Sequence, residues 1–220
     1  MIRVRRATRG SHWTKRARAT LIVSALGMLT VYLDVLMLNT ALPDIQREFG
    51  AGESGLQWLA STYSLGLAAF TMFAAALADR FGRKRIFMTS LLLLGIGFLG
   101  AGLAPTLGAM MAARGLQGVA AAGVIVTSLA LVSNAFESPG DRARAIGLWT
   151  GIASLGTALG PPLGGLLVEV LGWRSVFLLT VPVAAVLLSL SPGIWRSLGD
   201  AESRASTGGD RPSSSSPSAR

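Results

Sequence analysis

Two charged residues lie deep inside otherwise apolar stretches of the sequence. Asp34 stands nine residues before Pro43, and Arg114 stands seven residues after Leu107. At the helical rise these spacings place the two residues about 13 and 10 Å from the same face of a membrane. An ionised side chain in a lipid-facing helix costs a few kcal/mol or more, so each charge needs an explanation. Opposite charges at similar depth favour a proton- or substrate-handling site, and the alternative is a buried ion pair that fixes helix register.

Arg114 also begins a stripe of small residues in the same stretch. Arg114, Gly118 and Ala122 recur at every fourth position, on one side of a helix, where another helix could approach closely. Small residues at this spacing are common in membrane helices and are weak evidence by themselves. Packing does not require Arg114 or Gln117, however, so both are candidate site residues beside Asp34.

A short basic turn at residues 77–85 is the second candidate site. It holds an aspartate, a glycine and three consecutive cations, and its candidate gate residues are Asp79, Arg80, Gly82, Arg83 and Lys84. Membrane orientation needs only positive charge, which any scatter of Lys and Arg would supply. An aspartate at a helix end can cap the next helix or pair with an arginine, and sliding helices would break either contact. The turn therefore predicts a gate whose contacts change with conformation.

A segment rich in glycine and proline, at residues 156–165, is the third candidate site. Gly156, Gly160 and Gly164 fall at fourfold spacing on one helix face, which helix packing alone could explain. Packing does not explain two prolines among them, because prolines remove backbone donors and bend a helix. The segment predicts a bend used in function, with the candidate residues Gly156, Gly160, Pro161, Pro162, Gly164 and Gly165.

Six apolar stretches are long enough to hold these residues in a membrane. About 20 residues at the helical rise cross a hydrocarbon core of about 30 Å. Strands are a poor alternative, because the stretches are too long and too continuously apolar to alternate across a barrel wall. The sequence thus predicts an all-α membrane protein with six transmembrane helices at residues 20–43, 55–78, 86–104, 107–134, 145–171 and 175–191.

The composition argues against several other classes of protein. Hydrophobic residues make up 51% of the chain and charged residues only 14%, whereas soluble domains are about 25% charged. The basic residues flank the apolar stretches and do not form one folded surface, which argues against binding of nucleic acid. There is no cysteine, and the one histidine is His12. Because Asp34 is the only carboxylate deep within a span and the chain lacks a nucleotide-binding loop, we expect no hydrolase, cofactor or metal site.

The positions of Lys and Arg predict the orientation of the helices. Of the 20 basic residues, 17 lie in the two tails and in two turns on one side of the membrane. Arg47 and Arg174 lie on the other side, and Arg114 lies within a span. We therefore expect a multi-pass protein of the cell membrane with both termini in the cytoplasm. Its parts would be a basic tail at 1–19, a six-helix bundle at 20–191 and a disordered tail at 192–220.

These motifs, in this order, resemble those of the major facilitator superfamily, and within it the drug:proton antiporters of the fourteen-helix branch. Asp34 with its neighbours and the segment from Asn39 to Pro43 resemble the first-helix signature of that branch. The turn at 77–85 resembles motif A, and Arg114 to Gly118 resembles motif B. Gly156 to Gly165 resembles motif C, the hallmark of exporters, and Trp173-Arg174 resembles the opening of helix six.

The resemblance implies a fold, a function and roles for the candidate residues. The fold is the amino-terminal six-helix bundle of a transporter, and the function is export of small amphipathic or cationic compounds, such as antibiotics, in exchange for protons. Proton coupling or a place in the cavity is implied for Asp34, Asn39, Arg114 and Gln117. The implied partners are a small-molecule substrate, protons and the lipid bilayer, with neither enzyme activity nor nucleic acid.

The length of the chain does not match the resemblance. Transport in this fold is the rocking of two bundles around a midplane site, and 220 residues supply one bundle. We therefore expect a truncated or frameshifted gene product, or a fragment. The alternative to transport is a non-transporting remnant, or a half-transporter that needs a separate second six-helix bundle or a second copy of the chain.

Overall fold

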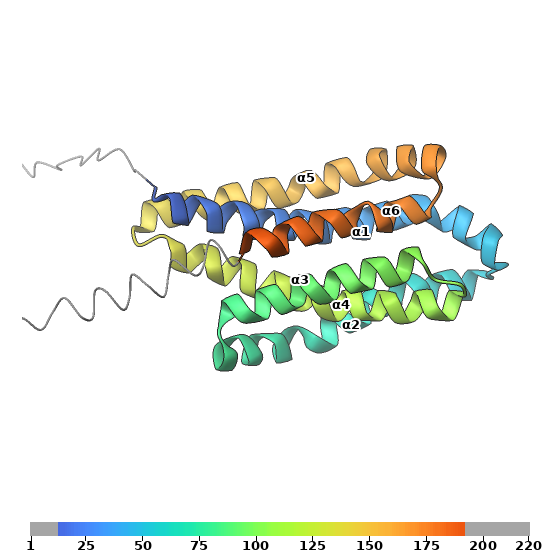
Figure 1. Ribbon diagram of the computed structural model, residues 1–220, viewed down its shortest axis with the longest axis horizontal. Helices are drawn as coiled ribbons and strands as arrows, with labels where there is room; N and C mark the ends of the chain where they lie inside the picture. Colours follow the sequence, from blue (N-terminus) through green and yellow to red (C-terminus); the bar gives the residue numbers. More distant parts are fainter. Residues whose placement is uncertain (1–12, 192–220) are drawn as a thin grey trace, which may run out of the picture.

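The computed structural model describes residues 13–191, which form six helical segments that run antiparallel to one another (Figure 1). The helices are α1 (Lys15–Phe49), α2 (Glu53–Phe81), α3 (Arg83–Gly102), α4 (Leu107–Ala135), α5 (Pro139–Leu171) and α6 (Arg174–Leu178). Helix α6 is interrupted by a turn at Leu179 and resumes over residues 180–191. Six segments, the last of them Arg174–Ser191, are long and apolar enough to cross a membrane. The predicted all-α fold is confirmed.

Helix α1 extends beyond both ends of the first predicted span. It begins inside the expected 1–19 tail, at Lys15, because the Thr14 hydroxyl accepts a hydrogen bond from the Ala17 amide at 3.1 Å and caps the helix. It also passes through Pro43, where the sequence predicted an end. A proline removes one backbone donor without obliging a helix to stop, and α1 ends instead at the left-handed Gly50, with φ 60°.

Helix α5 begins earlier than predicted, at Pro139, and again a cap explains the difference. The Ser138 hydroxyl accepts a hydrogen bond from the Asp141 amide at 3.1 Å, and proline is well tolerated in the first helical turn. The rest of the expected tails, residues 1–12 and 192–220, lie outside the described residues, so the prediction of a disordered carboxyl tail stays a prediction.

The helices form two groups that pack against each other (Figure 1). Helices α1, α5 and α6 lie on one side, and α2, α3 and α4 lie on the other. The closest pairs are α2 with α4, α1 with α5 and α3 with α4, while α1 packs on α4 across the groups. The turns α2–α3 and α4–α5 lie at one end of the bundle, opposite the other three turns, as alternate crossings of a membrane require.

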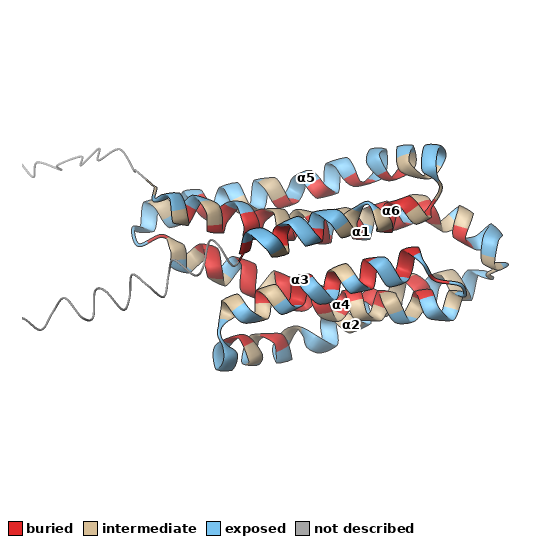
Figure 2. Ribbon diagram, in the orientation of Figure 1, coloured by how far each residue is buried: buried red, intermediate tan, exposed pale blue. Residues whose placement is uncertain are grey.

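Helices α1 and α4 form the centre of the bundle. In the most apolar window of each, 61% of the residues are buried, against 17% in α2 and 22% in α5. Figure 2 shows the consequence, because the outer surfaces of α2 and α5 are largely exposed while buried residues line the interior. The exposed residues are mostly apolar and include Met72 and Phe73 on α2 and Val170 on α5. This surface is suited to lipid or to another protein, and not to water.

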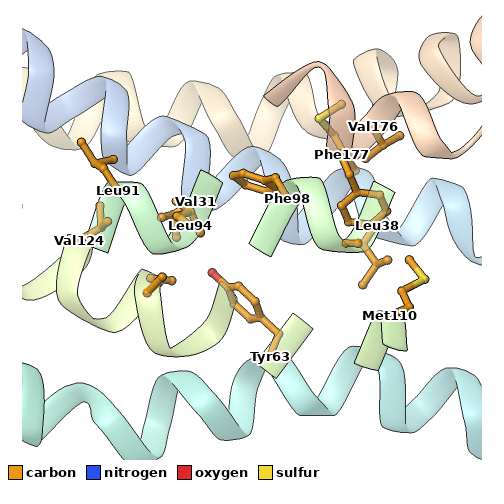
Figure 3. Close-up of a cluster of buried hydrophobic side chains, with 14 of the residues drawn as sticks. Val31, Leu38, Tyr63, Leu91, Leu94, Phe98, Met110, Val124, Val176 and Phe177 are labelled. Atoms are coloured by element: carbon orange, nitrogen blue, oxygen red, sulfur yellow. The ribbon is translucent and has the colours of Figure 1, made fainter. Parts of the chain in front are cut away.

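A cluster of buried apolar side chains fills the interior (Figure 3). It joins Leu38 of α1, Phe98 of α3, Met110 of α4 and Phe177 of α6, all less than 3% exposed. Tyr63 of α2 reaches into the same cluster and is 3% exposed. One core therefore connects five of the helices.

Glycine allows α2 and α4 to approach closely. A methyl group added at Gly118 of α4 would overlap the carbonyl oxygen of Tyr63 and lie 3.0 Å from the amide nitrogen of Leu67. A methyl group added at Gly66 of α2 would lie 2.6 Å from the carbonyl oxygen of Gly115. Because the clashing atoms belong to the backbone, they cannot rotate away. The stripe of small residues predicted beside Arg114 thus packs against α2.

We expect Gly118→Ala to destabilise the protein, because its methyl group must push α2 away from α4. Overpacking of this kind costs about 1–3 kcal/mol, which should lower the melting temperature of the purified protein in detergent by about 5 °C. The matched control is Gly151→Ala in α5, where an added methyl group meets no atom within 4 Å. That control should melt at the wild-type temperature or slightly above it. Equal melting temperatures for Gly118→Ala and wild type would show that the helices pack differently.

Candidate functional site

Asp34 and Arg114 form a direct ion pair in the centre of the bundle. The Arg114 Nη1 atom donates a hydrogen bond to Asp34 Oδ2 at 2.6 Å, and each side chain is 1% exposed. The pair joins α1 to α4, two helices whose contact the sequence could not establish. Burial makes the interaction strong and also makes either charge costly without its partner.

Gln117 and Tyr63 complete the surroundings of the guanidinium. Gln117 lies one turn after Arg114 on α4, and its Oε1 atom accepts a second hydrogen bond from Arg114 Nη1 at 2.7 Å. The guanidinium carbon lies over the ring of Tyr63, 4.5 Å from its centre. Sequence analysis identified Gln117 but missed Tyr63, because an uncharged aromatic residue in an apolar stretch does not stand out.

Four polar atoms of this network are buried and make no hydrogen bond to any residue that the structure describes. They are Asp34 Oδ1, Tyr63 Oη, Arg114 Nε and Gln117 Nε2. Two of these groups donate, one accepts, and the tyrosine hydroxyl can do both. A buried polar group without a partner costs free energy, so the site is chemically prepared to bind a proton, water or a polar ligand.

Asn39, the fourth residue predicted for this cavity, lies apart from the network. It is five residues after Asp34 on α1, so it points to a different side of the helix, and its side chain is exposed. The structure therefore brings together three of the four predicted residues.

The predicted gate is a turn of one residue between α2 and α3. Gly82 has φ 94° and ψ 132°, a conformation that side chains with a Cβ rarely adopt, and it allows α3 to begin at Arg83 directly after α2. Asp79 does not cap α3 and instead forms an exposed ion pair with Arg83 at 3.5 Å. Arg80 lies over the ring of Phe81 at 5.4 Å. Lys84, also predicted for the gate, lies in the first turn of α3.

The glycines of the predicted bend face α1. A methyl group at Gly156 would lie 2.9 Å from the carbonyl oxygen of Leu29, one at Gly160 2.7 Å from Leu36 Cβ, and one at Gly164 2.5 Å from Thr40 Oγ1. Each glycine is buried. The three glycines therefore form a close, smooth contact between α5 and α1.

The two prolines of the same segment face away from α1. Pro161 and Pro162 are exposed, and an added methyl group at Gly165 would meet no atom within 4 Å. Helix α5 continues across both prolines without a break, from Pro139 to Leu171. A functional bend at this segment stays a prediction.

A polar cluster at the opposite end of the bundle from Gly82 was missed by the sequence analysis. Glu48, near the end of α1, accepts a hydrogen bond from Trp173 Nε1 at 2.6 Å and forms an ion pair with Arg174 at 2.6 Å. Arg174 also lies over the Trp173 ring at 4.4 Å. The sequence indicated Arg174 as a marker of orientation and as part of the opening of helix six, but it did not indicate Glu48, which lies 126 residues away. The cluster fastens α1 to the α5–α6 turn.

No group of three or more His, Cys, Asp or Glu side chains that could hold a metal ion occurs among residues 13–191. The central site offers one carboxylate, one guanidinium, one amide and one phenol. Such a set can bind charge and exchange a proton.

Comparison with known proteins places these features in a family. A model of the Major Facilitator Superfamily matches residues 24–217. The chain is 53% identical to the multidrug resistance protein Stp of Mycobacterium tuberculosis over 172 residues, which cover 78% of this chain and 32% of that protein. It is 45% identical to the drug efflux pump JefA of the same organism over 178 residues, covering 81% of this chain and 35% of that protein.

A third relative is the puromycin resistance protein pur8 of Streptomyces alboniger. It is 38% identical over 168 residues, which cover 76% of this chain and 33% of that protein. The chain thus spans about a third of the length of the curated relatives it matches.

We expect Arg114→Leu to destabilise the bundle strongly, because it leaves the Asp34 carboxylate buried without its partner. Removing one member of a buried pair costs about 3–5 kcal/mol, which should lower the melting temperature by about 10 °C. The double variant Asp34→Leu with Arg114→Leu should recover part of this loss. Arg47→Leu is the matched control, since Arg47 pairs with Asp44 on the surface and is worth at most about 1 kcal/mol. A double variant less stable than Arg114→Leu would contradict the pairing.

Proposed function

Because this chain belongs to the major facilitator superfamily, we propose that it exports small amphipathic or cationic compounds in exchange for protons. The chain is a multi-pass membrane protein of a transporter family and is not an enzyme. The observation that carries the proposal is the buried network of Asp34, Arg114 and Gln117 between α1 and α4. Relatives named for drug efflux and drug resistance support export as its direction.

The charges of this network can account for the exchange of a cationic substrate for a proton. The Asp34 carboxylate can interact with a proton or with a cationic group of the substrate, and the two compete for one negative charge. Protonation of Asp34 would weaken its attraction to Arg114, and thereby the contact between α1 and α4. Binding of one cation would then favour release of the other, which is the requirement for antiport.

Two further elements would convert this local change into movement. The close glycine contact of α5 with α1 would transmit the movement of α1 to α5, so that the two helices move together. The turn at Gly82, with the exposed pair of Asp79 and Arg83, would provide the cytoplasmic gate. Both roles, like the role of Asn39 in the cavity, are part of the proposal.

A second six-helix bundle, or a second copy of the chain, is the proposed partner. The specific observation is the exposed apolar surface of α2 and α5, which includes Met72 and Val170, at 85% and 67% exposure. Rocking transport needs two bundles around one site, and these helices offer the surface for the second. The alternative function, a half-transporter or remnant that does not export alone, rests on the same observation.

Expression of the chain in a drug-sensitive bacterial host tests export. We expect the wild-type chain to lower the accumulation of a fluorescent cationic dye while the proton gradient is intact, and Arg114→Ala to return accumulation to that of the empty vector. Arg144→Ala, which removes an exposed cation outside the network, is the matched control and should export normally. If the chain exports only when a second bundle is co-expressed, it is a half-transporter. No export under either condition would favour the remnant.

We also propose that the chain lies in the cell membrane with both termini in the cytoplasm. The support is the distribution of charge, since the helix ends beside the turns α2–α3 and α4–α5 carry Arg80, Arg83, Arg85 and Arg144, whereas Arg47 and Arg174 stand at the other end.

Labelling of single cysteines tests this orientation, and the chain is convenient for it because it has no native cysteine. Glu53→Cys, at the start of α2, should react with a membrane-impermeant maleimide in intact cells. Glu137→Cys, in the α4–α5 turn, should react only after the membrane is permeabilised. Both positions are exposed, so access depends on the side of the membrane alone. The reverse pattern would mean that the bundle is inserted the other way.

A further inference from the structure

Tyr63 is the one neighbour of Arg114 in the network whose contact does not depend on a hydrogen bond from the guanidinium. The guanidinium carbon lies over its ring, 4.5 Å from the centre, whereas Asp34 and Gln117 both accept hydrogen bonds from Arg114 Nη1. The ring face carries negative charge density and attracts a cation, most strongly where water is excluded. Tyr63 therefore stabilises the cation without contributing a charge.

The backbone holds the ring in this place. The carbonyl oxygen of Tyr63 lies against Gly118, in the close contact between α2 and α4, one turn along α4 from Arg114. Tyr63 is 3% exposed, and Figure 3 shows its side chain pointing from α2 into the interior of the bundle. The backbone from which the ring projects cannot withdraw unless α2 separates from α4.

The hydroxyl group of Tyr63 does not explain its position. Its oxygen is buried and makes no hydrogen bond to any residue in the described part of the chain. The contact that the structure does show is made by the ring.

The ion pair and the ring differ in their response to a change of charge on Asp34. The ion pair weakens when the carboxylate becomes neutral, but the attraction between the ring and the cation does not require that charge. The groups that act electrostatically on Tyr63 are Asp34, Arg114 and Tyr32, and Tyr32 is 41% exposed on α1. A neutral Asp34 would thus leave the Tyr63 ring and Gln117 as the partners of a buried cation.

We propose that Tyr63 is a positioning residue, which holds the Arg114 side chain in the central site while the charge on Asp34 changes. The inference rests on the proposed proton exchange at Asp34 and deepens it. Without the ring, a neutral Asp34 would release a buried guanidinium that has to find another partner. With the ring, the cation stays in place, ready to pair again when the carboxylate loses its proton.

A comparison of melting temperatures in two backgrounds tests the proposal without any need for transport. Asp34→Asn mimics the neutral carboxyl group. In the purified full chain in detergent, Tyr63→Leu should lower the melting temperature in both backgrounds, and by about 3 °C more in the Asp34→Asn background, where the ring has become a main support of Arg114. Tyr63→Phe keeps the ring and removes only the unpartnered hydroxyl, so it should melt at or above the temperature of its parent in both backgrounds.

The matched control is Leu59→Ala. Leu59 lies one turn before Tyr63 on α2, is 0% exposed and has no ring, so its loss of buried volume should be the same in both backgrounds. An equal or smaller effect of Tyr63→Leu in the Asp34→Asn background would overturn the proposal and leave Tyr63 as an ordinary core residue, and so would a Phe variant that behaves like Leu. Absence of dye export, both by the chain alone and with a co-expressed second bundle, would overturn the proposed function, but it would not alter this result.

Discussion

The buried attraction between Asp34 and Arg114 is the interaction on which the rest of the bundle depends. Its two helices, α1 and α4, are the most buried, and every other helix packs against one or both of them. A charge of either sign alone in this interior would be prohibitively costly, so the two helices can pack only in a register that brings the charges together. The pair therefore fixes the register of α1 against α4, and α2 and α5 pack on the two helices held in this way. It also places Gln117 and Tyr63 around the guanidinium.

Close packing through glycine is the second constraint, and it complements the first. In a membrane the hydrophobic effect does not drive helices together, so contact requires surfaces that fit. Gly66 and Gly118 supply that surface between α2 and α4, and Gly156, Gly160 and Gly164 supply it between α1 and α5. The two helix contacts differ in the side chains that they bring together. The first brings a polar network together, whereas the second is smooth and nearly free of polar side chains.

Much of the fold and part of the central site could be predicted from the sequence. Charges inside apolar stretches are conspicuous, which made Asp34 and Arg114 identifiable, and the fourfold spacing of the glycines identified the contact faces although not the helices they face. Tyr63 and Glu48 could not be found in this way, because their importance comes from partners on other helices. The ends of α1 and α5 were misplaced because the hydroxyl caps of Thr14 and Ser138 outweighed the apolar pattern, and because Pro43 did not end its helix.

The cluster of Glu48, Trp173 and Arg174 has a mechanical consequence. It ties the far end of α1 to the α5–α6 turn, while the three glycines join α1 to α5 along its length. Helix α1 is thus held to its own group at two separated places, which resists rotation as well as translation. The two groups of helices would then move against each other as two stiff plates, with the central charges on the boundary between them. Strain created at that boundary would be relieved by shear between the plates, in preference to bending within either one.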